Sequence, residues 1–296
     1  MKCVSPLSIK DPAGTTGAVR FVVDCGRCGS CLHNRRVDWS FRLKEELRAA
    51  ISAWFVTLTY APENLPINND VQTLNKRDVQ LFIKRVRKDH QKKNSRLLRS
   101  LKMPPIRYYA VGEYGTNTDR PHYHLLIFNM HLETASRLDA FWPLGQIQMG
   151  TVQDAGIHYV TKYHVNYKSK QDIVDELTGE VVPMSDVRQA EFALMSKGIG
   201  RSYMDRIGTW HKDNKAAYVM NNGFKQRMPR YYRKNMRADQ LHVMTEEERH
   251  AYIDDKYFAE VERLAQFTTN PDSYLENALY QESLRIWKDA KNGLSL

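Results

Sequence analysis

IRYYAVGEYGTNTDRPHYHLLIF, residues 106–128, is the stretch that decides the fold. It opens with apolar and aromatic residues typical of a strand, passes through a turn rich in glycine, asparagine, aspartate and proline, and closes on a second apolar run. We therefore predict a strand on each side of that turn. Side chains on a strand alternate between faces, so His122 and His124 share one face while Tyr123 points into the opposite layer.

A candidate metal site follows from this stretch. If the two strands pair as a hairpin, Glu113 at the end of the first strand lies beside the two histidines. Two imidazoles and one carboxylate with open coordination positions suit Mg²⁺ or Mn²⁺ that contacts a phosphate oxygen. Asp119 in the turn is the alternative carboxylate, and a surface ion pair with Arg120 is the alternative role for Glu113.

The elements around this hairpin alternate between strands and helices, which predicts an α+β fold. Residues 54–60, WFVTLTY, are β-branched and aromatic and are expected to form a buried strand. The expected strands are 54–60, 106–115, 122–128 and 145–152; the expected helices are 34–53, one after an N-cap at Asn75, one from Asp154, 186–197 and two after residue 245.

Composition limits the classes of partner. The 296 residues suffice for one substantial catalytic domain and a small accessory module. Lysine and arginine outnumber aspartate and glutamate 44 to 34, and the formal net charge of +10 favours a polyanion, either nucleic acid or an anionic membrane surface. No apolar run approaches the roughly 18 residues that a spanning helix needs, and MKCVSPLSIK lacks the apolar core of a secretory signal. We therefore expect a cytosolic protein with reduced thiols.

The four cysteines form a second candidate metal site. Cys25, Cys28 and Cys31 are separated by two residues each, in a glycine-rich segment that can fold three sulfurs around one ion. With Cys3 as the fourth ligand they predict tetrahedral, structural Zn²⁺, and His33 is the reserve ligand. An iron–sulfur cluster and free reduced thiols are the alternatives.

Two basic segments are candidates for contact with DNA. The helix after Asn75 is apolar on one face and basic on the other, although a merely solvated face is the alternative. A later segment interleaves tyrosines with arginines, which suits a single strand because rings stack on bases while cations hold phosphates; an ordinary strand with a basic edge is the alternative. The residues predicted to bind DNA are Lys84, Arg85, Arg87, Lys88, Arg120, Arg230, Tyr231 and Tyr232.

A pair of tyrosines supplies candidate nucleophiles. On a helix, Tyr159 and Tyr163 stack one turn apart on the same face, with Lys162 between them. A tyrosine oxygen attacks phosphorus when a metal polarises the phosphate and withdraws charge from the leaving 3′ oxygen. Tyrosines at this spacing more often pack in a core, so the prediction depends on the histidines.

Together these features resemble the HUH endonuclease superfamily and, more closely, the replication initiators of microviruses of the gokushovirus branch. The resemblance covers roughly residues 20–235. One departure is Tyr123, which stands in the middle of the histidine motif where a purely aliphatic residue is usual. The segments that carry the resemblance are CGRCGSCLHNRR at 25–36, FVTLTY at 55–60, GEYG at 112–115, RPHYH at 120–124, YVTKY at 159–163, KGIG at 197–200 and PRYY at 229–232.

The resemblance implies a central antiparallel sheet flanked by helices, the RRM-like palm of HUH endonucleases, and an activity in rolling-circle replication. Tyr159 would nick single-stranded or melted origin DNA and keep the 5′ end, and Tyr163 would attack the regenerated origin so that the released strand closes. Lys162 would hold a phosphate or stabilise a phenolate. The implied partners are the phage origin, a host polymerase and a host helicase, in the cytoplasm of a host bacterium and away from membranes.

Three parts are predicted along the chain: a cysteine-rich module at 1–35, an endonuclease domain at 36–240 and a helical extension at 241–296. Two other functions compete with replication initiation. A two-tyrosine transposase of bacterial insertion sequences would use the same chemistry. A non-catalytic DNA-binding protein with a structural metal would bind DNA without cutting it, and its histidines and tyrosines would merely pack.

Overall fold

The computed structural model describes residues 3–10, 20–115, 118–162, 173–174, 181–182, 188–214, 216–221 and 223–236, with the isolated residues 262 and 266. The chain divides into two compact units, Ser40–Asp205 and a second made of Met1–Trp39 with Arg206–Leu296. The predicted division at residues 35 and 240 stays a prediction, and the helices expected after residue 245 lie outside the described residues.

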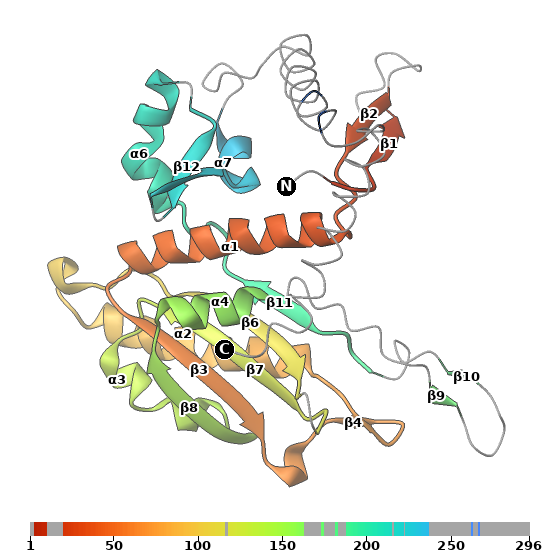
Figure 1. Cartoon of the computed structure of the whole chain (residues 1–296). Helices are drawn as coiled ribbons and strands as arrows, with labels where there is room; N and C mark the ends of the chain where they lie inside the picture. Colours follow the sequence, from red (N-terminus) through yellow and green to blue (C-terminus); the bar gives the residue numbers. More distant parts are fainter. Residues whose placement is uncertain are drawn as a thin grey trace. The chain divides into compact units, whose positions relative to one another are not determined.

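The unit Ser40–Asp205 is built on a five-stranded antiparallel sheet (Figure 1). The strand order is β11-β6-β7-β3-β8, so β7, which carries the histidines, is the middle strand. The α+β class and the antiparallel sheet are confirmed. The strands are β3 (Ala53–Tyr60), β6 (Arg107–Tyr114), β7 (Pro121–Phe128), β8 (Gly145–Thr151) and β11 (Phe192–Met195).

Helices and short strands accompany this sheet. The unit also has two pairs of two-residue strands, β4 (Ile67–Asn68) with β5 (Val71–Gln72) and β9 (Ile173–Val174) with β10 (Val181–Val182). The helices are α1 (Gly29–Ala49), α2 (Lys76–Ser95), α3 (Leu132–Ala135) and α4 (Asp154–Lys162), and the 3-10 turns are η1 (Pro62–Asn64), η2 (Arg99–Leu101) and η3 (Leu138–Phe141).

One face of the sheet packs against α2. The helix begins as predicted at Asn75, whose side chain accepts the N–H of Arg77 at 3.0 Å. Its apolar residues recur at helical spacing and meet alternate side chains of β3 and β7, among them Leu58 and Tyr123, in one buried cluster. The buried residues of α2 are Val79, Phe82, Ile83, Val86 and His90.

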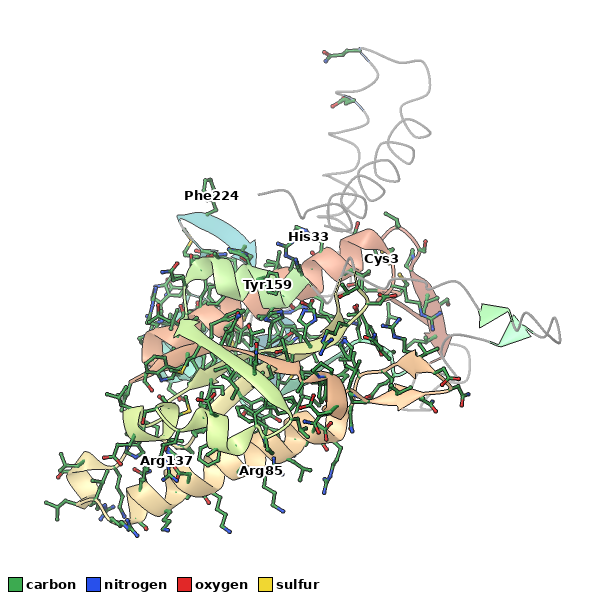
Figure 2. All side chains as sticks on the ribbon, turned by 90° about the horizontal axis from the view of Figure 1, so that it is seen from below. Cys3, His33, Arg85, Arg137, Tyr159 and Phe224 are labelled. Carbon is green, nitrogen blue, oxygen red and sulfur yellow. The ribbon has the colours of Figure 1, made fainter. Side chains whose placement is uncertain are left out.

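The opposite face of the sheet is covered by α4. Gly156 lies so close to β3 that a Cβ at this position would be 2.9 Å from the Phe55 ring. Ile157 and Val160 of the same helix are fully buried. Figure 2 shows that Arg85 of α2 and Tyr159 of α4 lie on opposite sides of the sheet.

The prediction of a helix over residues 186–197 is wrong in the part that the structure describes. Residues 192–195 form β11, the edge strand paired with residues 109–112 of β6. Phe192 and Leu194 are partly buried against the core, and the backbone hydrogen bonds to β6 fix the extended form. The pairing partner, which is remote in sequence, decides the structure of this segment.

The second unit contains short elements. A hairpin of β1 (Leu7–Lys10) and β2 (Arg20–Val23) precedes α1, and a hairpin of β12 (Tyr218–Asn221) and β13 (Phe224–Arg227) follows α6 (Ser202–Asp213). The segment predicted to interleave tyrosines with arginines forms a helix, α7 (Arg230–Asn235), so the strand alternative is wrong. Among the helices that the structure describes, none combines the length and the hydropathy that crossing a membrane requires.

Candidate active site

The register of three neighbouring strands brings the candidate metal ligands onto one face. In the β6–β7 hairpin Glu113 is paired directly with His122, as the hairpin prediction requires. On the other side of β7, Thr57 of β3 is paired with His124. Paired residues of an antiparallel sheet point to the same side, so these four side chains face α4.

Glu113 connects the two histidines. Its Oε1 atom lies 2.7 Å from Nε2 of His122 and 2.9 Å from Nε2 of His124. The three ligand atoms lie within 4.8 Å of one another. The carboxylate and His124 are buried, whereas the side chain of His122 is 20% exposed, so the site is open to solvent on one side.

The remaining ring nitrogens are oriented by protein oxygens. Nδ1 of His122 lies 3.0 Å from the carbonyl oxygen of Arg120, and Nδ1 of His124 lies 3.0 Å from the hydroxyl of Thr57. A carbonyl oxygen only accepts, so Nδ1 of His122 carries a proton and the neutral ring presents the lone pair of Nε2. Histidine ligands of metals are commonly held by such outer contacts, and the donor set fits Mg²⁺ or Mn²⁺.

Electrostatics keep the carboxylate charged. Burial raises the pKa of Glu113, but hydrogen bonds from His122 and His124 outweigh it and bring this pKa down to about 2. Burial lowers the pKa of His122, and the hydrogen bond to Glu113 reverses this effect and raises it. Glu113 is therefore ionised at neutral pH, as a metal ligand must be.

The hydroxyl of Tyr159 lies within the same group of atoms. It donates to Oε1 of Glu113 at 2.8 Å and lies 3.3 Å from Nε2 of His124. The ring packs edge-on against His124, with centroids 4.8 Å apart, and contacts Phe55 at 6.3 Å. Burial and the charge of Glu113 raise the pKa of Tyr159, so the phenol keeps its proton in this arrangement.

Lys162 lies beside the tyrosine one turn earlier on α4. Its Nζ atom is 4.1 Å from the centroid of the Tyr159 ring, and the residue is buried. A cation over a phenol ring stabilises negative charge on that ring. The predicted catalytic roles of Tyr159 and Lys162 stay predictions, and Tyr163 lies outside the described residues.

Comparison with known proteins gives an independent view of this region. A family model for the replication-associated protein ORF2 matches residues 53–169. The matched range begins with β3 and contains the candidate ligands and Tyr159. Among solved structures, none matches the chain.

Three relatives carry similar names. The chain is 27% identical over 240 residues to replication-associated protein ORF2 of Spiroplasma virus 4, which covers 73% of this chain and 68% of the relative. It is 26% identical over 229 residues to replication-associated protein VP4 of Bdellovibrio phage phiMH2K, covering 72% and 66%. The match to replication-associated protein ORF4 of Chlamydia phage 1 is 24% over 261 residues, covering 80% and 59%.

The chain is a relative of phage replication-associated proteins. The resemblance to microvirus initiators predicted from the sequence is thereby confirmed. The matches extend over more than two thirds of this chain, so they include segments on both sides of the candidate active site.

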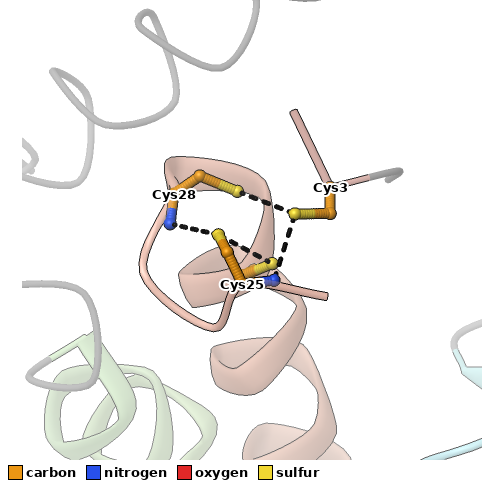
Figure 3. A group of neighbouring side chains, drawn as sticks. Cys3, Cys25 and Cys28 are labelled. Carbon is orange, nitrogen blue, oxygen red and sulfur yellow. Dashed lines mark hydrogen bonds between the residues drawn. The ribbon is translucent and has the colours of Figure 1, made fainter. Parts of the chain in front are cut away.

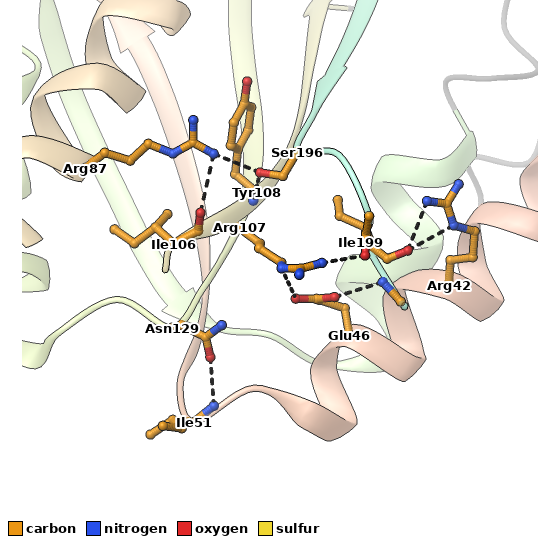
Figure 4. A network of polar contacts seen from close by, with 12 residues as sticks. Arg42, Glu46, Ile51, Arg87, Ile106, Arg107, Tyr108, Asn129, Ser196 and Ile199 are labelled. Carbon is orange, nitrogen blue, oxygen red and sulfur yellow. Dashed lines mark hydrogen bonds and ion pairs between the residues drawn. The ribbon is translucent and has the colours of Figure 1, made fainter. Parts of the chain in front are cut away.

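The residues predicted to bind DNA in this replication-associated protein lie in different places. Lys84, Arg85 and Lys88 are exposed on α2, on the face of the sheet opposite Tyr159. Arg87 instead donates to the carbonyl of Ile106 at 3.3 Å and to the hydroxyl of Ser196 at 3.0 Å (Figure 4). It therefore has a structural role that the sequence did not indicate.

Arg120 is the predicted DNA residue that lies next to the candidate ligands in sequence. Its side chain donates to the carbonyl of Tyr60 at 2.7 Å. In α7, Arg230 is exposed and Tyr231 is partly exposed, but Tyr232 is fully buried, so its ring is covered in this structure. Their contacts with DNA stay predictions.

The four predicted cysteine ligands come together in the second unit (Figure 3). Their sulfur atoms lie within 4.8 Å of one another, and the group contains Cys3 rather than the reserve ligand His33. All four cysteines are free of disulfides. The chain therefore has two separate clusters that could hold a metal, one of oxygen and nitrogen atoms and one of sulfur atoms.

The segment KGIG, residues 197–200, has a structural explanation. Both glycines have positive φ, 77° and 74°, a backbone conformation that favours glycine. The N–H of Gly200 donates to Glu46 of α1 at 2.8 Å, and the carbonyl of Ile199 accepts two hydrogen bonds from Arg42 at 3.1 and 2.9 Å (Figure 4). This part of the resemblance ties β11 to α1 and lies outside the candidate active site.

Sequence reasoning missed Thr57 and Phe55. Both lie on β3 and reach the site only because β3 pairs with β7 in one particular register. Alternation within residues 54–60 shows which of them share a face, but the pairing partner of that strand is 67 residues away. A local pattern gives no register for such a distant pair.

Proposed function

We propose that the chain is a metal-dependent, site-specific endonuclease that nicks origin DNA with a tyrosine and so initiates rolling-circle replication. The observation that carries the proposal is the shared contact at Glu113. One carboxylate oxygen contacts both histidines and the hydroxyl of Tyr159, so the candidate nucleophile adjoins the candidate metal ligands. We also propose that the antiparallel sheet is the palm of an HUH endonuclease.

The proposed chemistry transfers a phosphoryl group to a phenol. The oxygen of Tyr159 forms a bond to phosphorus while the bond to the 3′ oxygen breaks. The phenol loses its proton and the 3′ oxygen gains one, which leaves a 3′ hydroxyl and a 5′-phosphotyrosine link. Mg²⁺ or Mn²⁺ held by Glu113, His122 and His124 would polarise the phosphate and stabilise charge on the leaving oxygen.

The protein side chains contribute position and charge. Phe55 and Gly156 set how closely α4 approaches the sheet, and thus where the hydroxyl of Tyr159 lies. The ammonium group of Lys162 beside the ring favours the phenolate that attacks. Tyr163 is proposed as the second nucleophile that rejoins the strand, on the basis of the sequence alone.

The proposed partners follow from the charge of the chain and from its relatives. Single-stranded origin DNA would contact Arg120 near the site, and the exposed cations of α2 would hold phosphates elsewhere. A host polymerase would extend the 3′ hydroxyl, a host helicase would open the duplex, and the reaction would take place in the host cytoplasm. A two-tyrosine transposase would share the chemistry, but the relatives are named for replication.

A covalent-trapping assay tests the proposal. Single-stranded oligonucleotides tiled across the phage genome that encodes the chain are incubated with the full chain and Mn²⁺, and adducts are identified by mass spectrometry. We expect a 5′-phosphate adduct on Tyr159, its loss in Tyr159→Phe, and loss of cleavage in EDTA and in His122→Ala, with the folded state kept. Tyr108→Phe, on the opposite face of the sheet, is the matched control and should cut normally.

Two outcomes would contradict the proposal. DNA that shifts in a gel but is never cut, with Mn²⁺ present and with every oligonucleotide, would favour the non-catalytic binding protein. Cleavage that persists in the double variant Tyr159→Phe, Tyr163→Phe would show that the nucleophile is a different group.

A further inference from the structure

We propose that Cys3, Cys25, Cys28 and Cys31 hold one tetrahedral Zn²⁺ ion, and that this ion fastens the β1–β2 hairpin to the first turn of α1. The site shares no residue with the candidate active site. The inference therefore goes beyond the proposed nicking reaction and does not depend on it.

The distances between sulfur atoms match a single ion. A Zn–S bond of about 2.3 Å in a regular tetrahedron places the sulfurs about 3.8 Å apart. In the structure the sulfurs of Cys3 and Cys28 are 3.8 Å apart, those of Cys25 and Cys31 are 4.0 Å apart, and all pairs lie within 4.8 Å (Figure 3). Four ligands that are already at the spacing of one coordination sphere need little rearrangement to bind zinc.

The same distances argue against the alternatives. A disulfide needs sulfurs about 2.05 Å apart, far closer than any pair here. In a four-iron cluster each thiolate binds a different iron at a corner of a cube, so the cluster's own width separates the sulfurs more widely than one ion does. One ion is therefore the occupant that the observed spacing fits.

Backbone amides support charged sulfur atoms at this site. The N–H groups of Arg27 and Cys28 both point at the sulfur of Cys25, at 3.4 and 3.3 Å, and the N–H of Cys25 points at the sulfur of Cys3 at 3.3 Å. An N–H donor stabilises a thiolate more than a thiol, and zinc binds the thiolate. The turn that aims these amides depends on Gly26, whose φ is 74°.

The position of each ligand defines what the ion would join. Cys3 precedes β1, Cys25 follows β2, and Cys31 lies in the first turn of α1. The ion would thus close the loop formed by the β1–β2 hairpin and hold its base against the helix. A small element with few apolar contacts commonly gains its stability from such a bound metal.

Metal analysis of the purified full chain tests the inference without reference to nicking. We expect one zinc per chain that is released by a mercurial reagent that attacks thiolates. The variant His122→Ala with His124→Ala should keep this zinc, which separates it from any ion at the candidate active site. Cys28→Ser should lose it, and His33→Ala, the matched control in the same segment, should keep it.

A second measurement covers the case in which Cys28→Ser fails to fold. Wild-type protein loaded with Co²⁺ should show the strong visible bands and the sulfur-to-metal charge transfer of a tetrahedral four-thiolate site. Weak octahedral bands, iron with acid-labile sulfide, or four freely reacting thiols without zinc would each overturn the inference. So would zinc that persists in folded Cys28→Ser or disappears in the double histidine variant.

Discussion

At the scale of single residues, the site depends on partners that lie behind the ligands. Tyr123 departs from the aliphatic residue usual in such a histidine motif, yet it is fully buried on the α2 side of the sheet. Its hydroxyl lies 2.8 Å from that of Tyr60 and accepts the N–H of Asn75 at 2.8 Å. A buried hydroxyl with such partners carries no desolvation penalty, so the substitution is compatible with the two histidines on the other face.

Thr57 gives a test at this scale. Thr57→Val removes the hydroxyl that faces Nδ1 of His124 and keeps the shape of the side chain. We expect the affinity for Mn²⁺ to fall about tenfold, at the lower end of what loss of such an outer contact costs, with the melting temperature almost unchanged. Thr57→Ser keeps the hydroxyl and is the control. Equal affinity for Mn²⁺ in Thr57→Val and wild type, measured by titration calorimetry, would show that Thr57 does not orient the ligand.

At the scale of elements, local patterns predicted what local sequence controls. The strands at 54–60, 106–115, 122–128 and 145–152 were all found within one or two residues of their predicted ends, because each is a short apolar run closed by turn residues. Glu113 came to lie beside His122 because a hairpin is the simplest pairing of adjacent strands. The edge strand β11 was missed because its structure depends on β6, far away in the chain.

The placement of α4 belongs to this scale and could not be predicted. The sequence placed a tyrosine on a helix, but only the packing of Gly156 against Phe55 brings its hydroxyl to Glu113. A side chain at Gly156 would meet the Phe55 ring at 2.9 Å, which is closer than real Cβ contacts come. The distance between nucleophile and ligands is thus set by a residue with no side chain.

Gly156→Ala should therefore slow cleavage without weakening metal binding. We expect the single-turnover rate to fall by roughly tenfold or more, because small displacements of a reacting group cost up to about a hundredfold in rate. Gly150→Ala, on β8, is the control, since a Cβ there meets nothing within 4 Å. Unchanged cleavage in folded Gly156→Ala would mean that α4 tolerates the shift. Quench-flow kinetics at saturating Mn²⁺ provides the measurement.

At the scale of the whole molecule, the charge of +10 is the feature that composition revealed at once. Composition did not show where the charge acts. Lys84, Arg85 and Lys88 form an exposed basic face on α2, whereas Arg87 on the same helix is used to hold residues 106 and 196. Only the structure separates cations that are available to phosphates from cations that hold the fold together.

Neutralising this basic face should weaken DNA binding generally. The variant Lys84→Ala with Lys88→Ala should bind every oligonucleotide more weakly, with the slope of log affinity against log salt reduced by up to about 1.4 for two lost phosphate contacts on a single strand. Cleavage at saturating DNA should stay at the wild-type rate. Gln80→Ala with Gln91→Ala changes the same exposed helix without changing its charge. An unaltered salt slope in fluorescence anisotropy would exclude α2 as a phosphate-binding surface.

The sheet itself separates two tasks. Because α2 and α4 cover opposite faces of β3 and β7, a DNA strand that touches the basic face and also reaches Tyr159 has to pass around an edge of the sheet. The nucleotides that are gripped and the nucleotide that is cut then differ, and the bases between them stay accessible. A chemical footprint of the bound strand would accordingly read as two protected stretches with an unprotected gap, a signature of the bend that the protein imposes on its DNA.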